Sequence, residues 1–135
     1  MSELEGRVVA ITGAARGMGR AYVRGFLAEG AKVVAMDRSW EPTGFSGDND
    51  GAFLKELEAA ADDVLVATVD ISDPGQIGDA YEQTLDKFGT VDVLINNASL
   101  RQRNLFPPSG RITTLETNDS DWENMFAVSL FGTLK

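Results

Sequence analysis

Apolar residues occur along this chain in two alternating arrangements: short uninterrupted runs, and longer stretches in which they recur every three or four positions. The short runs are rich in β-branched residues and suit parallel strands buried on both faces, whereas the spaced stretches suit helices with one buried face. The predicted strands are 8–11, 32–36, 64–69 and 91–95. The intervening segments predict helices from the glycines after residue 12 to residue 29, over 53–61, over 74–88, and from about 118 to 133.

Residues that start and stop helices stand at the predicted boundaries. Asp73 is a good cap ahead of Pro74, which is tolerated at a first helical position, and Gly89 follows the last apolar residue of that helix. Gly30 stands where the first helix needs a left-handed closing residue. In the last helix, Asn118 or Ser120 can act as the cap, and Ser120 and Glu123 have the spacing of a capping box.

Strands that alternate with helices in this way predict an α/β fold. Right-handed crossovers would wind the four strands into a Rossmann-type, doubly wound parallel sheet with the order 3-2-1-4. With 135 residues and no shift in composition, we expect one domain over residues 1–135.

Glycines follow the first predicted strand directly and precede a helix. Gly13 allows a tight turn out of the strand, Gly17 allows backbone N–H groups to approach a pyrophosphate, and Gly19 allows the helix to lie close to its strand. A phosphate group would lie at the N-terminus of this helix, where unpaired N–H groups and the helix dipole favour an anion. The pattern therefore predicts a dinucleotide site, although glycine turns after strands are also common in proteins without one.

Asp37 ends the second predicted strand, about 20 residues beyond the glycine turn, where a carboxylate can accept hydrogen bonds from the adenosine ribose. Arg16 and Arg38 could each pair with the extra phosphate of NADP. That phosphate and the Asp37 carboxylate would be like charges a few ångströms apart, with a repulsion on the order of a few kcal/mol. We therefore expect NAD in preference to NADP.

Polar or acidic residues also follow the third and fourth predicted strands, namely Asp70-Ile71 and Asn96-Asn97. Ligands gather at these strand ends in open parallel sheets. The asparagine amides can either fasten neighbouring strands or hold a ribose, and the residues alone favour neither role. Two irregular loops, 39–51 and 100–117, carry further candidates that are more often structural: Trp40 and Phe45 near an adenine, and Arg101 and Arg103 near an acidic substrate.

Composition narrows the possible partners. The chain has 12 Lys and Arg against 21 Asp and Glu, and its net charge of -9 disfavours nucleic acid and anionic membranes. It contains neither cysteine nor histidine, so it has no disulfide, no thiolate nucleophile, no cysteine zinc site and no histidine ligand, and we expect no metal site. It has no bilayer-spanning apolar run and its first residues do not resemble a signal peptide, so we expect a cytoplasmic protein.

Taken in order, these motifs closely resemble the N-terminal part of a short-chain dehydrogenase/reductase. The turn 12–19 matches that family's Thr-Gly-x-x-x-Gly-x-Gly pattern, Asp37 its specificity position, Asp70-Ile71 its adenine-contacting pair, and 96–98 its fourth-strand motif. The resemblance implies an NAD(P)-dependent oxidoreductase that transfers hydride to or from an alcohol or carbonyl substrate. The cofactor-binding residues that it implies are Gly13, Arg16, Gly17, Met18, Gly19, Asp37, Arg38, Asp70, Ile71, Asn97 and Ala98.

Some residues depart from the family pattern. Ser99 replaces a glycine after the fourth-strand motif, and Ser129 replaces an asparagine that helps to organise a proton relay. The family's catalytic serine and Tyr-x-x-x-Lys pair have no counterpart, because Tyr22 and Tyr81 are not followed by lysine at that spacing. We therefore assign no catalytic residue and expect a sheet that is incomplete, truncated after the fourth strand and the following helix.

The resemblance also implies an assembly. The last helix usually contributes to the oligomer interface in this family, where Trp122, Phe126 and Phe131 could act as anchors, so the complete enzyme is expected to be a homo-oligomer. The expected function is the cofactor half of a dehydrogenase, inactive on its own. The alternatives are a non-catalytic NAD-binding module and a fragment without function.

Overall fold

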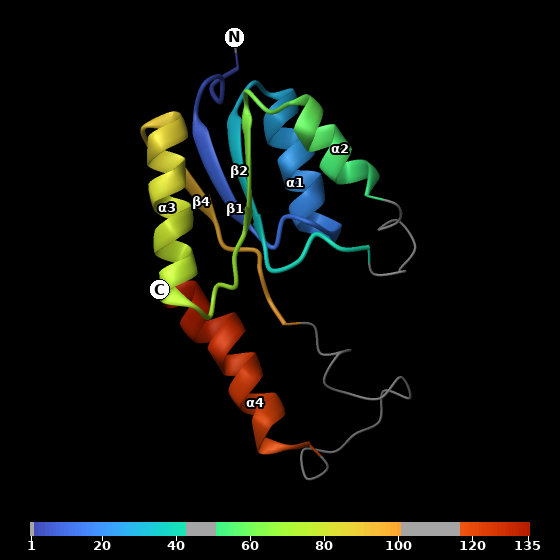
Figure 1. Cartoon of the computed structure of the whole chain (residues 1–135), viewed down its shortest axis with the longest axis vertical. Helices are drawn as coiled ribbons and strands as arrows, with labels where there is room; N and C mark the ends of the chain where they lie inside the picture. Colours follow the sequence, from blue (N-terminus) through green and yellow to red (C-terminus); the bar gives the residue numbers. More distant parts are fainter. Residues whose placement is uncertain (1, 43–50, 101–116) are drawn as a thin grey trace.

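The structure is a computed structural model that describes residues 2–42, 51–100 and 117–135. Strands and helices alternate through the first four strands, and the chain then ends in a helical segment (Figure 1). The elements are β1 (Val8–Thr12), α1 (Gly17–Ala28), β2 (Lys32–Asp37), α2 (Ala52–Ala59), β3 (Val64–Thr68), α3 (Pro74–Phe88), β4 (Val93–Ile95), α4 (Asp119–Phe126) and the π-helical segment η3 (Ala127–Gly132).

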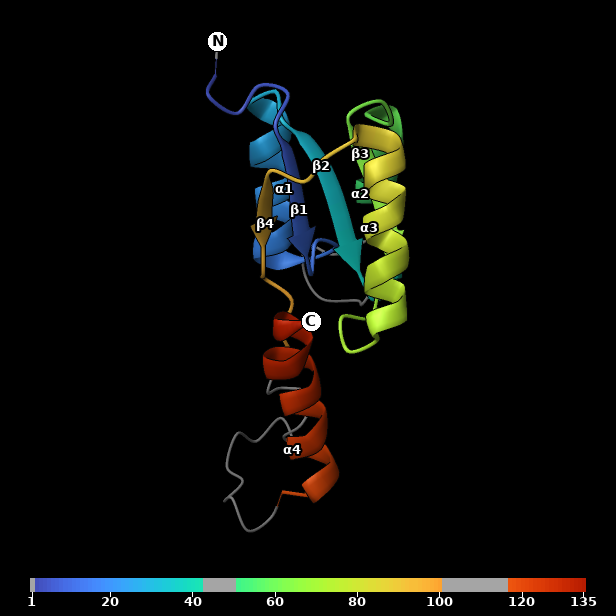
Figure 2. The same cartoon turned by 90° about the vertical axis from the view of Figure 1, so that its left-hand side faces the viewer.

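The four strands form one parallel sheet in the order β3-β2-β1-β4. Val9 of β1 is in register with Val33 of β2 on one side and with Val93 of β4 on the other. Helices α1 and α2 cover one face of the sheet and α3 lies on the other (Figures 1 and 2). The predicted α/β fold and its strand order are therefore confirmed.

Strand β1 is buried on both faces, which explains its uninterrupted apolar sequence. Val9 and Ile11 belong to a core cluster that includes Val23 of α1 and Phe53 of α2. The alternate residues of β1 join a second cluster, against which Phe88 of α3 packs. The sheet is thus the middle of three layers, and the carboxyl ends of its strands lie on the side of the last helical segment (Figures 1 and 2).

The predicted ends of α1 and α3 agree with the structure. Oδ1 of Asp73 accepts hydrogen bonds from the backbone N–H groups of Gly75 at 2.8 Å and Gln76 at 3.4 Å, and the helix starts at Pro74. Gly89 closes it with a φ of 78°, and Gly30 follows α1 with a φ of 79°. Both angles lie in the left-handed region, where glycine is favoured.

Strand β4 is shorter than the predicted 91–95, because ladder pairing starts only at Val93. The reason lies in Asp92, whose carboxylate accepts the hydrogen bond of the Val8 N–H at 2.8 Å, a donor that strand pairing would otherwise use. Asp92 returns its own N–H to the Val8 carbonyl at 2.9 Å. In the described sheet β4 is an edge strand, and its Leu94 is 57% exposed.

The last helix differs from the prediction in two respects. Of the two predicted cap residues Asn118 occupies the N-cap position, but its side chain makes no capping hydrogen bond, and the capping box of Ser120 and Glu123 is not formed. From Ala127 onward the helix widens into a π-helix, and its Gly132 lies against Ile71, where an added Cβ would stand 2.9 Å from the Ile71 Cγ1. Within the described ranges, no helix is long and apolar enough to cross a membrane.

Candidate functional site

A cavity of about 260 Å³ lies at the carboxyl ends of the strands, between the glycine turn and η3. Every strand contributes to its wall through residues at or just beyond its end. The cavity contains nine of the eleven residues predicted from the sequence, the exceptions being Gly17 and Gly19. Its lining comprises Gly13, Arg16, Met18, Asp37, Arg38, Val69, Asp70, Ile71, Asn97, Ala98, Ser99, Leu100 and Val128.

The glycine turn needs its glycines for two distinct reasons. Gly13 and Gly17 have φ angles of 67° and 52°, in the left-handed region that L side chains rarely adopt. Gly19 is required by space, because a Cβ there would overlap the carbonyl oxygen of Gly13. The N-terminus of α1 can therefore lie directly beside the end of β1, and its first N–H groups are placed next to the cavity.

Asp37 faces the glycine turn from the end of β2. Its Oδ2 accepts a hydrogen bond from the N–H of Ala15 at 2.9 Å, and its Oδ1 accepts one from the N–H of Ser39 at 3.2 Å. The carboxylate is therefore held by backbone donors on both oxygens. An ionised carboxylate can accept about four hydrogen bonds, so Asp37 keeps acceptor capacity toward the cavity that it lines.

Asn97 connects the end of β4 with the end of β1. Its amide Nδ2 donates to the carbonyls of Thr12 at 3.0 Å and Gly13 at 3.1 Å, so both amide hydrogens are used within the protein. The Thr12 hydroxyl in turn accepts the N–H groups of Asn97 and Ala98, each at 3.0 Å. Of the two roles considered for these asparagines, the structure shows Asn97 fastening neighbouring strands, and only its Oδ1 remains for a ligand.

Asp70 lines the cavity from just beyond the end of β3. Its Oδ1 accepts hydrogen bonds from the Ser72 hydroxyl at 2.6 Å and the Ser72 N–H at 2.9 Å. The hydroxyl bond is the main cause that lowers the pKa of Asp70; partial burial acts against it, and the backbone bond and the nearby charge of Arg38 reinforce it. Asp70 is therefore ionised over the physiological range.

The two arginines of the cavity wall have different surroundings. Arg16 donates from Nη2 to the backbone carbonyl of Glu41 at 2.8 Å, which draws its guanidinium toward the segment after β2. Arg38 is exposed, and its charge acts on Asp70. Arg16 thus bonds a backbone carbonyl, and Arg38 interacts through its charge with the Asp70 carboxylate.

Residues of η3 and of the segment after β4 complete the site, and of these the sequence singled out Ser129 but neither Val128 nor Leu100. The Ser129 hydroxyl accepts the N–H of Leu100 at 3.2 Å, and Val128 contributes an apolar surface from η3. Ser129 therefore ties the last helix to the segment beyond β4. No local pattern could identify Val128, because it reaches the cavity only through the packing of η3.

The remaining candidates lie away from the cavity or outside the described residues. Trp40 packs on Phe53 with ring centroids 6.4 Å apart and donates to the Ala67 carbonyl at 3.3 Å, so it anchors its loop. Tyr22 and Tyr81 are exposed residues of α1 and α3. Phe45, Arg101 and Arg103 fall outside the part of the chain that the structure describes. Among the residues it does describe, no three acidic side chains gather as a metal site would need.

The cavity thus combines a helix N-terminus, two carboxylates and an apolar wall formed by Val69, Ile71 and Val128. The helix start suits an anionic group, the carboxylates suit hydroxyl donors, and the apolar residues suit a flat ring. A nucleotide carries these three groups together. The residues present therefore fit a nucleotide cofactor.

Comparison with known proteins agrees with this geometry. The short chain dehydrogenase family model matches residues 7–135. A fluoren-9-ol dehydrogenase from Terrabacter is 48% identical over 133 residues, covering 98% of this chain and 35% of the relative. A 3-oxoacyl-(acyl-carrier-protein) reductase from Thermotoga maritima is 34% identical over 129 residues, covering 96% of this chain and 46% of the relative. The chain therefore spans less than half the length of these two curated relatives.

Solved structures show the same fold. A 3-ketoacyl-(acyl-carrier-protein) reductase from Brucella melitensis, complexed with NADH, superposes with a TM-score of 0.77 at 29% identity, covering 98% of this chain and 48% of that one. A short chain dehydrogenase/reductase from Burkholderia phymatum, in complex with NAD, gives a TM-score of 0.77 at 28% identity, covering 99% of this chain and 42% of that one. On its sequence, strand order and cavity, this chain belongs to the short-chain dehydrogenase family.

Proposed function

We propose that residues 1–135 form the cofactor-binding half of an NAD-dependent oxidoreductase that acts on an alcohol or carbonyl substrate. The observation that carries this proposal is the placement of Asp37, whose carboxylate is held beside the N-terminus of α1 by the N–H of Ala15 at 2.9 Å. A carboxylate and a helix N-terminus beside the same cavity suit the ribose and the pyrophosphate of one dinucleotide. NAD and NADH are also the cofactors named for two structures of the same fold.

The pyrophosphate is assigned to the turn between Gly13 and Gly19. The positive φ angles of Gly13 and Gly17 favour glycine, so the turn has no side chain at these two positions. The N-terminus of α1 supplies backbone N–H donors and the positive end of its dipole. Met18, which is 68% exposed, also lines the cavity at this turn. Binding of the two phosphates then requires no cationic side chain.

The adenosine end is assigned to Asp37, Asp70 and Ile71. Asp37 accepts hydrogen bonds from the ribose hydroxyls, while Ile71 and its apolar neighbours offer a surface to the adenine. A phosphate on that ribose would meet the negative charge of Asp37. At about 4 Å and an effective dielectric constant of about 20 the repulsion is roughly 4 kcal/mol, which supports NAD over NADP.

The nicotinamide end is assigned to the side of Asn97 and Ala98. When bound, the cofactor supplies or accepts the hydride of the reaction. Asn97 holds the ends of β1 and β4 together through the carbonyls of Thr12 and Gly13, so its contribution is to keep this wall in place, with Oδ1 available to the ligand. No residue among these 135 is assigned to proton transfer.

Calorimetric titration with NAD and NADP tests this proposal. We expect NAD to bind and NADP to bind more weakly. Gly17→Val, which places a β-branched residue at a φ of 52°, should abolish binding of both, whereas Gly25→Val on the open surface of α1 should not. Absence of NAD binding by the unmodified protein, or unchanged affinity in Gly17→Val, would contradict the proposal.

A further inference from the structure

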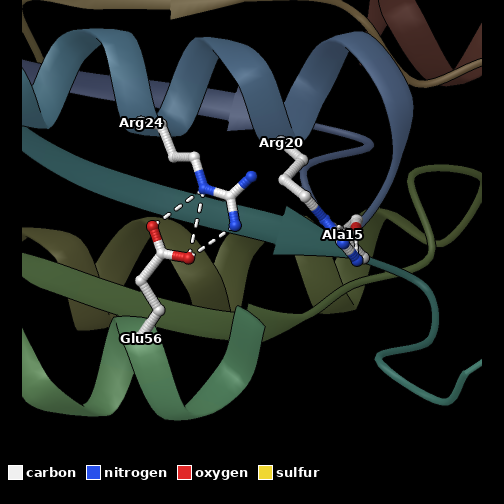
Figure 3. Close-up of polar contacts among 4 residues, drawn as sticks. All are labelled: Ala15, Arg20, Arg24 and Glu56. Carbon is white, nitrogen blue, oxygen red and sulfur yellow. Dashed lines mark hydrogen bonds and ion pairs between the residues drawn. The ribbon is translucent and has the colours of Figure 1, made fainter. Parts of the chain in front are cut away.

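Arg20 of α1 turns back toward the glycine turn that precedes its own helix. Its Nε and Nη2 donate hydrogen bonds to the carbonyl oxygen of Ala15 at 3.0 Å and 2.7 Å (Figure 3). Two donors of one guanidinium on one acceptor form a strong, charge-assisted contact with a defined direction. The contact fixes the orientation of the peptide that links Ala15 to Arg16.

Arg24, one turn later on the same face of α1, makes a different contact. Both guanidinium groups lie over the ring of Phe53, at 4.6 Å for Arg20 and 5.2 Å for Arg24. Arg24, however, forms a forked ion pair with Glu56 of α2, with Nε 2.8 Å from Oε1 and Nη2 2.6 Å from Oε2 (Figure 3). Arg24 therefore ties α1 to α2, whereas Arg20 reaches the turn.

Ala15 is held from both of its peptide groups. Its N–H donates to Oδ2 of Asp37 at 2.9 Å, and its carbonyl receives Arg20. The residue is buried, and none of the described peptide bonds is cis. In a planar trans peptide the carbonyl and the following N–H point in opposite directions, so capture of the Ala15 carbonyl by Arg20 directs the N–H of Arg16 away from Arg20.

We propose that Arg20 is a positioning residue of the cofactor site, acting through Ala15 on Asp37 and on the first turn of α1. This inference rests on the function proposed above. Arg20 does not line the cavity of about 260 Å³, so its effect on a ligand is indirect. Without it, the Ala15 carbonyl is released, and the N–H that orients the Asp37 carboxylate becomes free to turn.

Paired substitutions at positions 20 and 24 separate this role from general stabilisation. Arg20→Met and Arg24→Met each keep an unbranched stem over Phe53 and remove one guanidinium. We expect Arg20→Met to raise the Kd for NAD roughly tenfold and to reduce the preference for NAD over NADP, because a charge-assisted contact is lost and Asp37 is less well oriented. Arg24→Met should change the Kd less than twofold, and Arg20→Lys should restore part of the affinity.

The decisive quantity is the ratio of the NADP and NAD dissociation constants, because a loss of overall stability does not alter it. An unchanged ratio in Arg20→Met, or equal effects of Arg20→Met and Arg24→Met on it, would overturn the positioning role. Both titrations use the full chain, and thermal unfolding of each variant confirms that it is folded at the temperature of the measurement.

Amide hydrogen exchange in the ligand-free protein distinguishes failure of this inference from failure of the proposed function. We expect the Ala15 N–H to exchange faster in Arg20→Met and at the original rate in Arg24→Met. Unchanged exchange in Arg20→Met overturns the role of Arg20. Faster exchange together with an unmodified protein that fails to bind NAD overturns the cofactor proposal instead.

Discussion

Thr12 and Asn97 hold the ends of β1 and β4 together through reciprocal hydrogen bonds. The Thr12 hydroxyl accepts the N–H of Asn97 at 3.0 Å, and the Asn97 amide donates to the Thr12 carbonyl at 3.0 Å. The same hydroxyl also accepts the N–H of Ala98 at 3.0 Å. The buried Thr12 hydroxyl oxygen therefore accepts hydrogen bonds from two backbone N–H groups just beyond the end of β4.

Thr12→Val should lower the free energy of unfolding by about 1–3 kcal/mol, because it leaves two backbone N–H groups without their acceptor at a buried position. Thr12→Ser retains the oxygen and should lose much less. Chemical denaturation of the two variants measures the difference. Equal stability of the valine and serine variants would show that the hydroxyl does not hold this wall.

Asp37→Ser should shift the cofactor preference toward NADP. It removes the charge that opposes a ribose phosphate while leaving a small polar group, so we expect the Kd for NADP to fall at least tenfold relative to that for NAD. Asp79→Ser removes the same charge from the exposed surface of α3 and serves as the control. Equal effects of the two substitutions on the ratio of Kd values would indicate a general charge effect.

Ser72→Ala should raise the pKa of Asp70 toward its ordinary value, because the Ser72 hydroxyl bond is the main cause that lowers this pKa. NMR titration of the Asp70 carboxyl measures the change. Ser39→Ala removes a hydroxyl in another loop, where it accepts the N–H of Glu41, and should not change the pKa of Asp70.

The lowered pKa of Asp70 also contributes to the pH dependence of stability. A carboxyl whose pKa is lower in the folded state stabilises the fold above its unfolded pKa, about 3.9 for aspartate, and this stabilisation disappears as the pH falls through the lowered folded pKa. Ser72→Ala should therefore lower the free energy of unfolding at neutral pH. The further decrease of this free energy on acidification should be smaller in Ser72→Ala than in the unmodified protein. A steeper acid loss in Ser72→Ala than in the unmodified protein would contradict this account of Asp70.

Gly132→Ala should destabilise the protein, although alanine is the better helix former. Its Cβ would lie 2.9 Å from Cγ1 and 3.0 Å from the carbonyl oxygen of Ile71, so either η3 or the cavity wall must move, at a cost of about 1–3 kcal/mol. Gly25→Ala, in open space on α1, should instead stabilise by roughly 0.5–1 kcal/mol. Thermal unfolding with the same sign for both would exclude a tight contact at Gly132.

Much of the fold could be predicted from the sequence, because the deciding signals are local. The apolar runs of β1 and β2 and the residues that bound α3, Asp73 and Gly89, specify the alternation of strands and helices. The length of β4 could not be predicted, because it depends on the carboxylate of Asp92 reaching Val8, a contact across 84 positions. The π-helical end of the last helix also lacked a local signal.

Cavity residues that directly follow a strand could be predicted from the sequence. Residues whose part in the site depends on the packing of side chains could not. Asp37 and Asp70 line the cavity, as their positions after β2 and β3 indicated. The part played by Thr12 depends on donors more than 80 positions away, and that of Arg20 on the path of its side chain back to Ala15. The motifs at 12–19 and 96–98 contain Thr12 and Asn97, but neither the pairing of these two residues nor the contact of Arg20 with Ala15 follows from the spacing of residues in the sequence.

Mapping NAD on the isotopically labelled protein by NMR tests the central claim most directly. We expect the largest amide shift changes at the turn 13–19, at the end of β2 around Asp37, and at 70–71 and 97–100, with small changes on the outer faces of α2 and α3. Saturable changes centred on α4 between Asp119 and Phe126, with the glycine turn unaffected, would contradict it.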